Sequence, residues 1–174
     1  MRVFVTDLVM GTLISPTPRG ILRLLLRFPI VLYRLGLGWL FGNRFLLLTH
    51  VGRKSGMERS TVLEVVRHDR PKDRYFIASG WGKKAQWYRN VAKNPNVRYT
   101  VGARTRTGLA RPISTESAEQ ELREYGRRHP RALRKLVKMM LGEVFEDNDE
   151  QYRRLSKQVP MLEISPNGGA LGAL

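Results

Sequence analysis

Basic residues and glycines are concentrated in one short segment, Thr49 to Arg59, which lies between two apolar runs. The runs, 45–48 and 61–66, are typical of strands, so the segment is predicted to be the loop of a β-hairpin. Glycine permits positive φ and close backbone approach, while guanidinium and ammonium groups attract anions. Together these residues predict an anion site that suits phosphate best. They are Gly52, Arg53, Lys54, Ser55, Gly56 and Arg59.

The same composition is also typical of a solvated hairpin tip, and the spacing matches neither a P-loop nor a dinucleotide fingerprint. A second stretch favours the binding site. It runs from Ile77 to Asn90, contains Trp87-Tyr88-Arg89-Asn90, and is followed by Lys93-Asn94-Pro95.

The two stretches together resemble the deazaflavin-dependent nitroreductase family, small split-barrel flavin-like reductases that use coenzyme F420. Gly52 to Gly56 correspond to its G-R-(K)-(S/T)-G loop. Trp87 to Asn90, with Asn94-Pro95, correspond to its W-Y-x-N and N-P signatures. The likeness extends from Arg44 to Pro166 in the same order of elements.

The resemblance implies an α+β fold, a split β-barrel of the FMN-binding-like antiparallel kind with N-terminal and C-terminal helices. It implies an oxidoreductase whose coenzyme is F420, an 8-hydroxy-5-deazaflavin with a phosphate and an oligoglutamate tail. The loop from Gly52 to Arg59 would hold the phosphate, and Asn90 would lie close to the coenzyme. Trp87 is expected to support the core. The segment that would run along the ring consists of Ala78, Ser79, Gly80, Trp81, Gly82 and Lys83.

Two positions depart from the family pattern. Ala85 stands where proline is common, and Trp81 stands where a small residue is common, so its indole could reshape or partly close the ring site. Flavin mononucleotide would satisfy the same loops and is the alternative coenzyme. A proton for the reduced substrate would come from water or a hydroxyl, and the candidate donors are Tyr88, Tyr152 and Ser79.

Composition restricts the remaining possibilities. The chain has 174 residues and 42% hydrophobic content, which predicts one domain with a core. It has no cysteine, and His50, His68 and His129 are far apart, so no metal site is expected. The formal charge of +16 would attract nucleic acid, an anionic membrane surface or a polyanionic small molecule. No recognisable nucleic-acid module is present, which makes nucleic acid the least expected partner, and a cytoplasmic location is expected.

The segment 1–43 is the most unusual part of the chain. Helical structure is predicted over 20–41, with a narrow polar stripe on an otherwise apolar surface, and Pro29 is expected to kink the helix or to start a second one. The stripe contains Arg19, Arg23, Arg27, Arg34 and Gly38. Such a helix either packs on the barrel or on a second copy in a homodimer, or lies in an anionic membrane interface at the inner face of the cell membrane.

Strands are predicted at 45–48, 61–66, 75–78, 97–101 and 105–113, and the basic residues of the fifth, Arg104, Arg106 and Arg111, are expected to face outward. The family resemblance implies a closing strand at 160–166. Helices are predicted after Ala85, from a capping box at Ser117, after Pro130, and from the acidic run 146–150. The barrel domain would thus span 44–166, followed by a tail over 167–174. The function predicted from all these features is hydride transfer from reduced deazaflavin to a quinone, nitro-aromatic or activated alkene. A basic membrane-binding or nucleic-acid-binding module without catalysis is the alternative from a different class.

Overall fold

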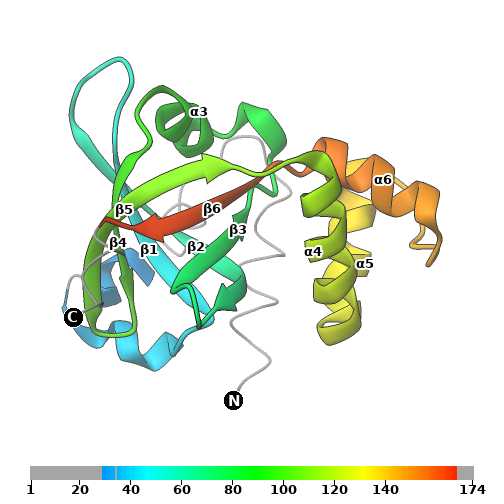
Figure 1. The fold of residues 1–174 in the computed structure, drawn as a ribbon, viewed down its shortest axis with the longest axis horizontal. Helices are drawn as coiled ribbons and strands as arrows, with labels where there is room; N and C mark the ends of the chain where they lie inside the picture. Colours follow the sequence, from blue (N-terminus) through cyan, green and yellow to red (C-terminus); the bar gives the residue numbers. More distant parts are fainter. Residues whose placement is uncertain (1–28, 34, 168–174) are drawn as a thin grey trace, which may run out of the picture.

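Six antiparallel strands form a closed barrel in the order β1-β2-β3-β6-β5-β4 (Figure 1). The structure, a computed structural model, describes residues 29–33 and 35–167. The strands are β1 (Phe45–Val51), β2 (Glu58–Asp69), β3 (Arg74–Ala78), β4 (Asn96–Val101), β5 (Arg104–Pro112) and β6 (Met161–Pro166). The predicted barrel is confirmed. The ends of each predicted strand differ from the observed ends by no more than three residues.

Alternating side chains of the strands fill the barrel. Leu46 and Leu48 of β1 are fully buried, as are Ile77 of β3 and Ile164 of β6, and Tyr99 of β4 joins them in one cluster. This spacing of two residues is what a strand needs to direct one set of side chains inward. The barrel interior is therefore an apolar core rather than a channel.

The hairpin between β1 and β2 is tighter than predicted. His50 pairs with Arg59 and Val51 pairs with Glu58, so the strands continue into the segment expected to be loop. Only residues 52–57 form the tip. Cross-strand pairing extends β2 to 12 residues, which the polar character of Glu58 and Arg59 concealed in the sequence. We call the end of the barrel that carries residues 52–57 the loop end, and the opposite end the far end.

A short helix covers the loop end of the barrel (Figure 1). The 3-10 helix η3 (Gly82–Lys84) leads into α3 (Gln86–Lys93), which ends at Asn94, as the Asn94-Pro95 signal predicted. Trp87 and Val91 of α3 belong to the cluster inside the barrel, at 8% and 1% exposure. Trp87 thus supports the core, as expected, and α3 is fixed to the barrel by its apolar face.

A lobe of three helices connects β5 to β6 and packs beside the barrel (Figure 1). The helices are α4 (Thr115–Arg128), α5 (Pro130–Leu141) and α6 (Asp149–Gln158). Their buried residues form a second core with Val66, Phe76 and Met161 from the outer face of the barrel. Val66 lies at an irregularity in the pairing of β2 with β3, where the register shifts between Val65 and Arg67. The extra residue at this bulge packs against the lobe instead of the barrel interior.

The start of α4 differs from the prediction. The helix begins at Thr115, two residues before the predicted capping box at Ser117, and the Ser114 hydroxyl accepts a hydrogen bond from the Ser117 backbone N–H. Ser114 is therefore the N-cap, since its extended backbone allows the side chain to reach the first free amides. The acidic run does start α6, where Asn148 is the N-cap.

Ionic contacts hold α4 on β2. The Arg67 guanidinium donates to both carboxylate oxygens of Glu121, at 2.6 to 2.9 Å, and lies over the Phe76 ring. The Tyr125 hydroxyl donates to Glu64 at 3.3 Å, and Arg44 approaches the same carboxylate at 3.4 Å. Burial raises the pKa of Glu64, and the two neighbours only partly oppose that rise.

The prediction that one helix continues from Pro29 to residue 41 is wrong. Residues 29–33 are helical, but Gly36 has φ of 74° and a separate 3-10 helix, η2 (Leu37–Phe41), follows. Glycine adopts this left-handed conformation without cost, and it ends the helix. The predicted arginines of the stripe, at 19, 23, 27 and 34, lie outside the described residues.

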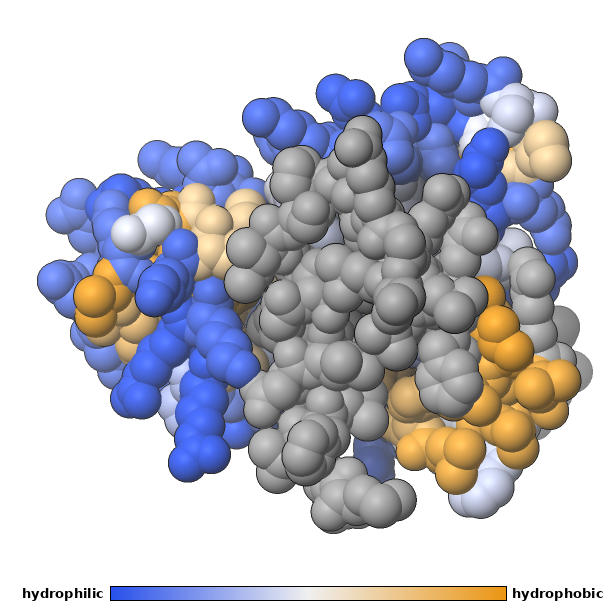
Figure 2. Space-filling model, turned by 180° about the vertical axis from the view of Figure 1, so that it is seen from behind, coloured by the Kyte–Doolittle hydropathy of each residue, from blue (hydrophilic) through white to orange (hydrophobic). Residues whose placement is uncertain are grey.

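The described part of this segment is both anchored and exposed. The Tyr33 hydroxyl donates to the Phe45 carbonyl at 2.8 Å, and a Cβ on Gly38 would lie 2.5 Å from the Gly102 carbonyl oxygen. Four other apolar residues of this segment are exposed to solvent. They are Val31, Leu35, Trp39 and Leu40, at 47%, 67%, 60% and 55% exposure. An apolar surface is visible at the lower right of Figure 2. Within the described residues, no helix is long and apolar enough to cross a membrane.

Candidate active site

The tip of the β1–β2 hairpin is a compact turn. The Gly52 N–H donates to the Met57 carbonyl and the Gly56 N–H donates to the Gly52 carbonyl, both at 2.8 Å. Gly56 has φ of 66°, which favours glycine. A Cβ on Gly52 would lie 2.8 Å from Ser55 Oγ and 3.1 Å from Arg59 Nε. The loop therefore brings Ser55 and Arg59 against the Gly52 backbone, in a space that a side chain at residue 52 would fill.

The donors of this loop fit a phosphate. The backbone N–H groups of Lys54 and Ser55 have no acceptor among the described residues, whereas Gly52, Arg53, Gly56 and Met57 each donate to a protein atom. The Lys54 and Arg59 side chains are exposed and have no ion-pair partner in the described part of the chain. Two free amides and two free cations are donors of the kind that bind phosphate groups in proteins.

Arg53 differs from the other two cations because α3 holds it. Asn90 Oδ1 accepts from the Arg53 backbone N–H at 3.2 Å and from Arg53 Nη1 at 2.9 Å. The same Nη1 donates to Gln86 Oε1 at 3.0 Å. Both acceptors are neutral, so the guanidinium keeps its charge while its position is fixed.

Asn90 is itself buried, at 4% exposure, and its amide nitrogen lies 3.3 Å from His50 Nδ1. His50 is equally buried, at 4%. Burial lowers the pKa of His50, and the positive charge of Arg59 lowers it further. A hydrogen bond with the Val51 backbone raises the pKa but does not cancel these two effects. His50 is therefore neutral at pH 7. Sequence reasoning missed Gln86 and His50; the i, i+4 spacing of Gln86 and Asn90 on a helix was the available signal.

The second predicted segment forms a rigid turn after β3. The Ser79 N–H donates to the Pro160 carbonyl and the Gly82 N–H donates to the Ser79 carbonyl, both at 2.9 Å. Gly82 has φ of 61°, and a Cβ there would lie 3.0 Å from the Gln158 carbonyl oxygen. The Gly80 and Trp81 amides have no acceptor among the described residues, and the Trp81 side chain is 38% exposed. Ala78 ends β3, and Lys83 lies in η3.

The three candidate proton donors lie in different surroundings. The Ser79 hydroxyl donates to the Gly82 carbonyl at 2.8 Å and the residue is 1% exposed. Tyr152 is 4% exposed in the core of the helical lobe, where Arg123 lies over its ring. Tyr88 is half-buried on α3 against the Trp87 ring, and burial raises the pKa of its phenol. Of the three, only Tyr88 is both protonated and accessible beside the loop end.

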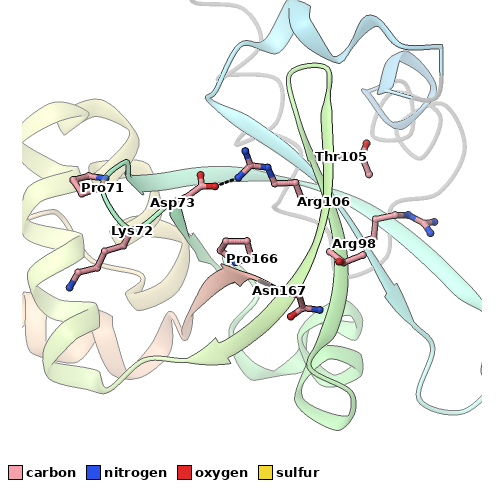
Figure 3. A pocket seen from close by; sticks show the side chains of 9 residues that line it. Pro71, Lys72, Asp73, Arg98, Thr105, Arg106, Pro166 and Asn167 are labelled. Carbon is pink, nitrogen blue, oxygen red and sulfur yellow. Dashed lines mark ion pairs between the residues drawn. The ribbon is translucent and has the colours of Figure 1, made fainter. Parts of the chain in front are cut away.

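The far end of the barrel has a different character. A cleft of about 940 Å³ opens there between the β2–β3 turn, β5 and the end of β6 (Figure 3). Arg106, whose side chain is 41% exposed, pairs with Asp73 across it. In register, Arg106 lies opposite the buried Tyr99, and β6 ends at Pro166 before it could cover this part of β5. The Lys72 and Arg98 side chains point away from each other (Figure 3), so the cleft does not gather its cations around one ligand.

A closed six-stranded antiparallel barrel, with a glycine-rich basic hairpin beside a capping helix, is the split-barrel fold that the sequence resemblance implied. The sequence profile of the F420H(2)-dependent quinone reductase family matches residues 34–133, and the chain belongs to this family. The predicted family, the oxidoreductase class and coenzyme F420 are thereby confirmed.

Two solved structures illustrate the shared fold. An F420-H2 dependent reductase called FDR-A is 21% identical, aligns over 71% of this chain and 96% of its own, and has a TM-score of 0.50. The protein Atu2129 from Agrobacterium tumefaciens str. C58, of unknown function, is 17% identical over 89% of this chain and 59% of its own, with a TM-score of 0.51. At these identities the likeness concerns the fold alone.

Proposed function

We propose that the protein uses reduced coenzyme F420 to reduce a quinone, with the coenzyme phosphate held at residues 52–59. The observation that carries the proposal is the pair of free amides, Lys54 and Ser55, between a fixed Arg53 and the exposed Lys54 and Arg59 side chains. The description of the family supports a quinone as acceptor over a nitro-aromatic or an activated alkene.

The bound coenzyme supplies a hydride from carbon, which is chemistry that protein side chains lack. The protein would orient the two reactants and deliver a proton. The turn from Ser79 to Gly82 would lie along the ring, because its backbone is fixed and two of its amides are free. A quinone that gains a hydride becomes a hydroquinone anion, and Tyr88 would donate the proton that completes the hydroquinone.

Titration of the full-length protein with coenzyme F420 and with flavin mononucleotide, followed by quenching of tryptophan fluorescence, tests the coenzyme. Tighter binding of F420 is expected. The loaded enzyme is then mixed with a quinone, a nitro-aromatic compound and an activated alkene, and oxidation of the reduced coenzyme is recorded. Fastest turnover with the quinone supports the proposal. Preference for flavin mononucleotide, or no turnover with any quinone, would refute it.

The exposed residues near η2 support a membrane interface as the place where a lipid-soluble quinone is met. Tyr33 and Gly38 attach the segment to the barrel, while Leu35, Trp39 and Leu40 remain 55 to 67% exposed. An outward apolar cluster on a chain with formal charge +16 has the two features that attract a protein to an anionic membrane surface. The proposal is peripheral contact through this cluster.

Sedimentation with anionic liposomes tests this contact. Leu35→Ser, Trp39→Ser and Leu40→Ser together should reduce co-sedimentation strongly while coenzyme affinity stays the same. Val144→Ser is the matched control, because Val144 is 85% exposed in the helical lobe. Substitution is cleaner than removal of residues 1–43, which also takes away the Tyr33 contact with Phe45. Equal sedimentation of the triple variant and wild type would exclude the cluster as the contact.

A further inference from the structure

The contacts beneath the phosphate loop fix which way the Asn90 amide points. Two donors of Arg53, the backbone N–H and Nη1, face one end of this amide at 3.2 and 2.9 Å. Only an oxygen can accept from both, so that end is Oδ1 and the opposite end is the Nδ2 donor. The direction of the amide follows from the hydrogen bonds around it.

The direction of Asn90 then fixes the state of His50. Nδ2 of Asn90 lies 3.3 Å from His50 Nδ1, so Nδ1 must accept and cannot carry a proton. His50 is therefore neutral, with its proton on Nε2. If Nδ1 were protonated, it would require Oδ1 of Asn90, and the amide would have to present Nδ2 to the two donors of Arg53.

The location of the pair makes this arrangement effective. His50 is the next inward-facing residue of β1 after Leu46 and Leu48, and Asn90 is on the buried face of α3, so both lie at the seam between barrel and helix. A buried polar group without a hydrogen-bond partner is costly. Each hydrogen bond in the series from His50 through Asn90 to Arg53 therefore depends on the next one. Of His50, Asn90 and Arg53, only Arg53 reaches the surface of the loop, where it is half-buried.

We propose that His50 and Asn90 are positioning residues that hold Arg53 for the coenzyme phosphate, and that neither touches the coenzyme. This inference rests on the proposed function, since it assigns the phosphate to residues 52–59. It differs from the expectation that Asn90 itself lies against the coenzyme. In that case Asn90 would contribute to binding whether or not Arg53 is present.

A double-mutant cycle separates the two roles. Arg53→Ala should weaken binding of coenzyme F420 by roughly 10- to 100-fold, as expected for loss of one charge-assisted contact. Asn90→Leu should weaken it by a comparable factor in the wild-type background, but by less than about threefold when Arg53 is already alanine. His50→Phe should behave like Asn90→Leu in both backgrounds. Losses that multiply in the double variants would overturn the proposal.

The state of His50 is measured independently of the coenzyme. Nitrogen-15 NMR of the histidine ring in the full-length protein should show His50 neutral at pH 7 with the proton on Nε2, and Asn90→Leu should change its Nδ1 shift. A proton on Nδ1 would overturn the proposed pair even if coenzyme binds. Failure of wild type to bind coenzyme would instead refute the proposed function, and the predicted ring state would still decide whether the pair exists.

Discussion

Replacing Lys54 and Arg59 by alanine together is the most direct test of the phosphate site. Both side chains are exposed and have no ion-pair partner within the described structure, so their removal leaves no buried group unsatisfied. The free energy of unfolding should change by less than about 0.5 kcal/mol, as is usual for surface substitutions. The effect is therefore expected in binding and not in stability.

The magnitude follows from the contacts that each side chain can make. A hydrogen bond to a charged group contributes about 1.5–3 kcal/mol, which corresponds to roughly 10- to 100-fold in affinity per contact. The double variant should therefore bind coenzyme F420 about 100-fold more weakly, or worse, because the two cations approach the phosphate from different positions. Arg53 and the free amides of Lys54 and Ser55 remain, so some binding should survive.

The assay is a fluorescence titration near 0.15 M salt, where the Debye length is about 8 Å and long-range attraction is largely screened. Arg70→Ala with Lys72→Ala is the matched control, because both residues are exposed at the far end of the barrel. This control removes the same charge but should leave affinity within about threefold of wild type. If both double variants lose affinity equally, only the net charge matters. If the Lys54 and Arg59 variant titrates like wild type, the phosphate lies elsewhere.

Three further substitutions test other contacts. Gly52→Ala should weaken coenzyme binding about tenfold with little change in melting temperature. The new Cβ would lie 2.8 Å from Ser55 Oγ, so it displaces the Ser55 hydroxyl and leaves the core intact. Unchanged affinity would contradict the compact loop. Arg67→Ala should lower the free energy of unfolding by about 3 kcal/mol in urea titrations, because it leaves the Glu121 carboxylate buried without its bidentate partner; a change below about 0.5 kcal/mol would show that the pair does not hold α4. Glu64→Gln should alter the pH dependence of stability. Burial raises the pKa of Glu64 above its usual 4.5, so wild type loses stability as the pH rises from 4.5 through the raised pKa. The variant should lack that loss of stability. If urea titrations give the same pH dependence of the free energy of unfolding for both proteins, this role of Glu64 is excluded.

The strands β1 and β3 could be predicted because they are short apolar runs in the sequence. The closure of the strands into a barrel, with β6 as the closing strand, was implied by the family resemblance. The end of α3 was equally clear from Asn94-Pro95. The extension of β2 to Glu58 was not, since charged residues at a strand end are predicted as loop unless their cross-strand partners are known.

The composition of residues 52–59 could be predicted, but the contacts that hold Arg53 could not. Two glycines and three cations are visible in the sequence, yet the role of Arg53 depends on Asn90, which is 37 residues away. The state of His50 depends on the same distant amide, 40 residues away. Contacts of this kind arise only when α3 covers the end of the barrel. The turn at Gly36 was missed for a different, local reason, because the apolar residues around it were given more weight than one glycine.

The helical lobe leaves and re-enters the barrel at neighbouring points. Pro112 at the end of β5 pairs with Leu162 at the start of β6, so helices α4 to α6 occupy what is formally the loop of a β-hairpin. A connection whose ends are already adjacent can be lengthened, shortened or exchanged without altering the strand order. Related proteins could therefore differ widely in this lobe while they keep the same barrel and the same β1–β2 hairpin. A protein with a shorter connection would need polar residues in place of Val66 and Phe76, or a second subunit that covers these two positions.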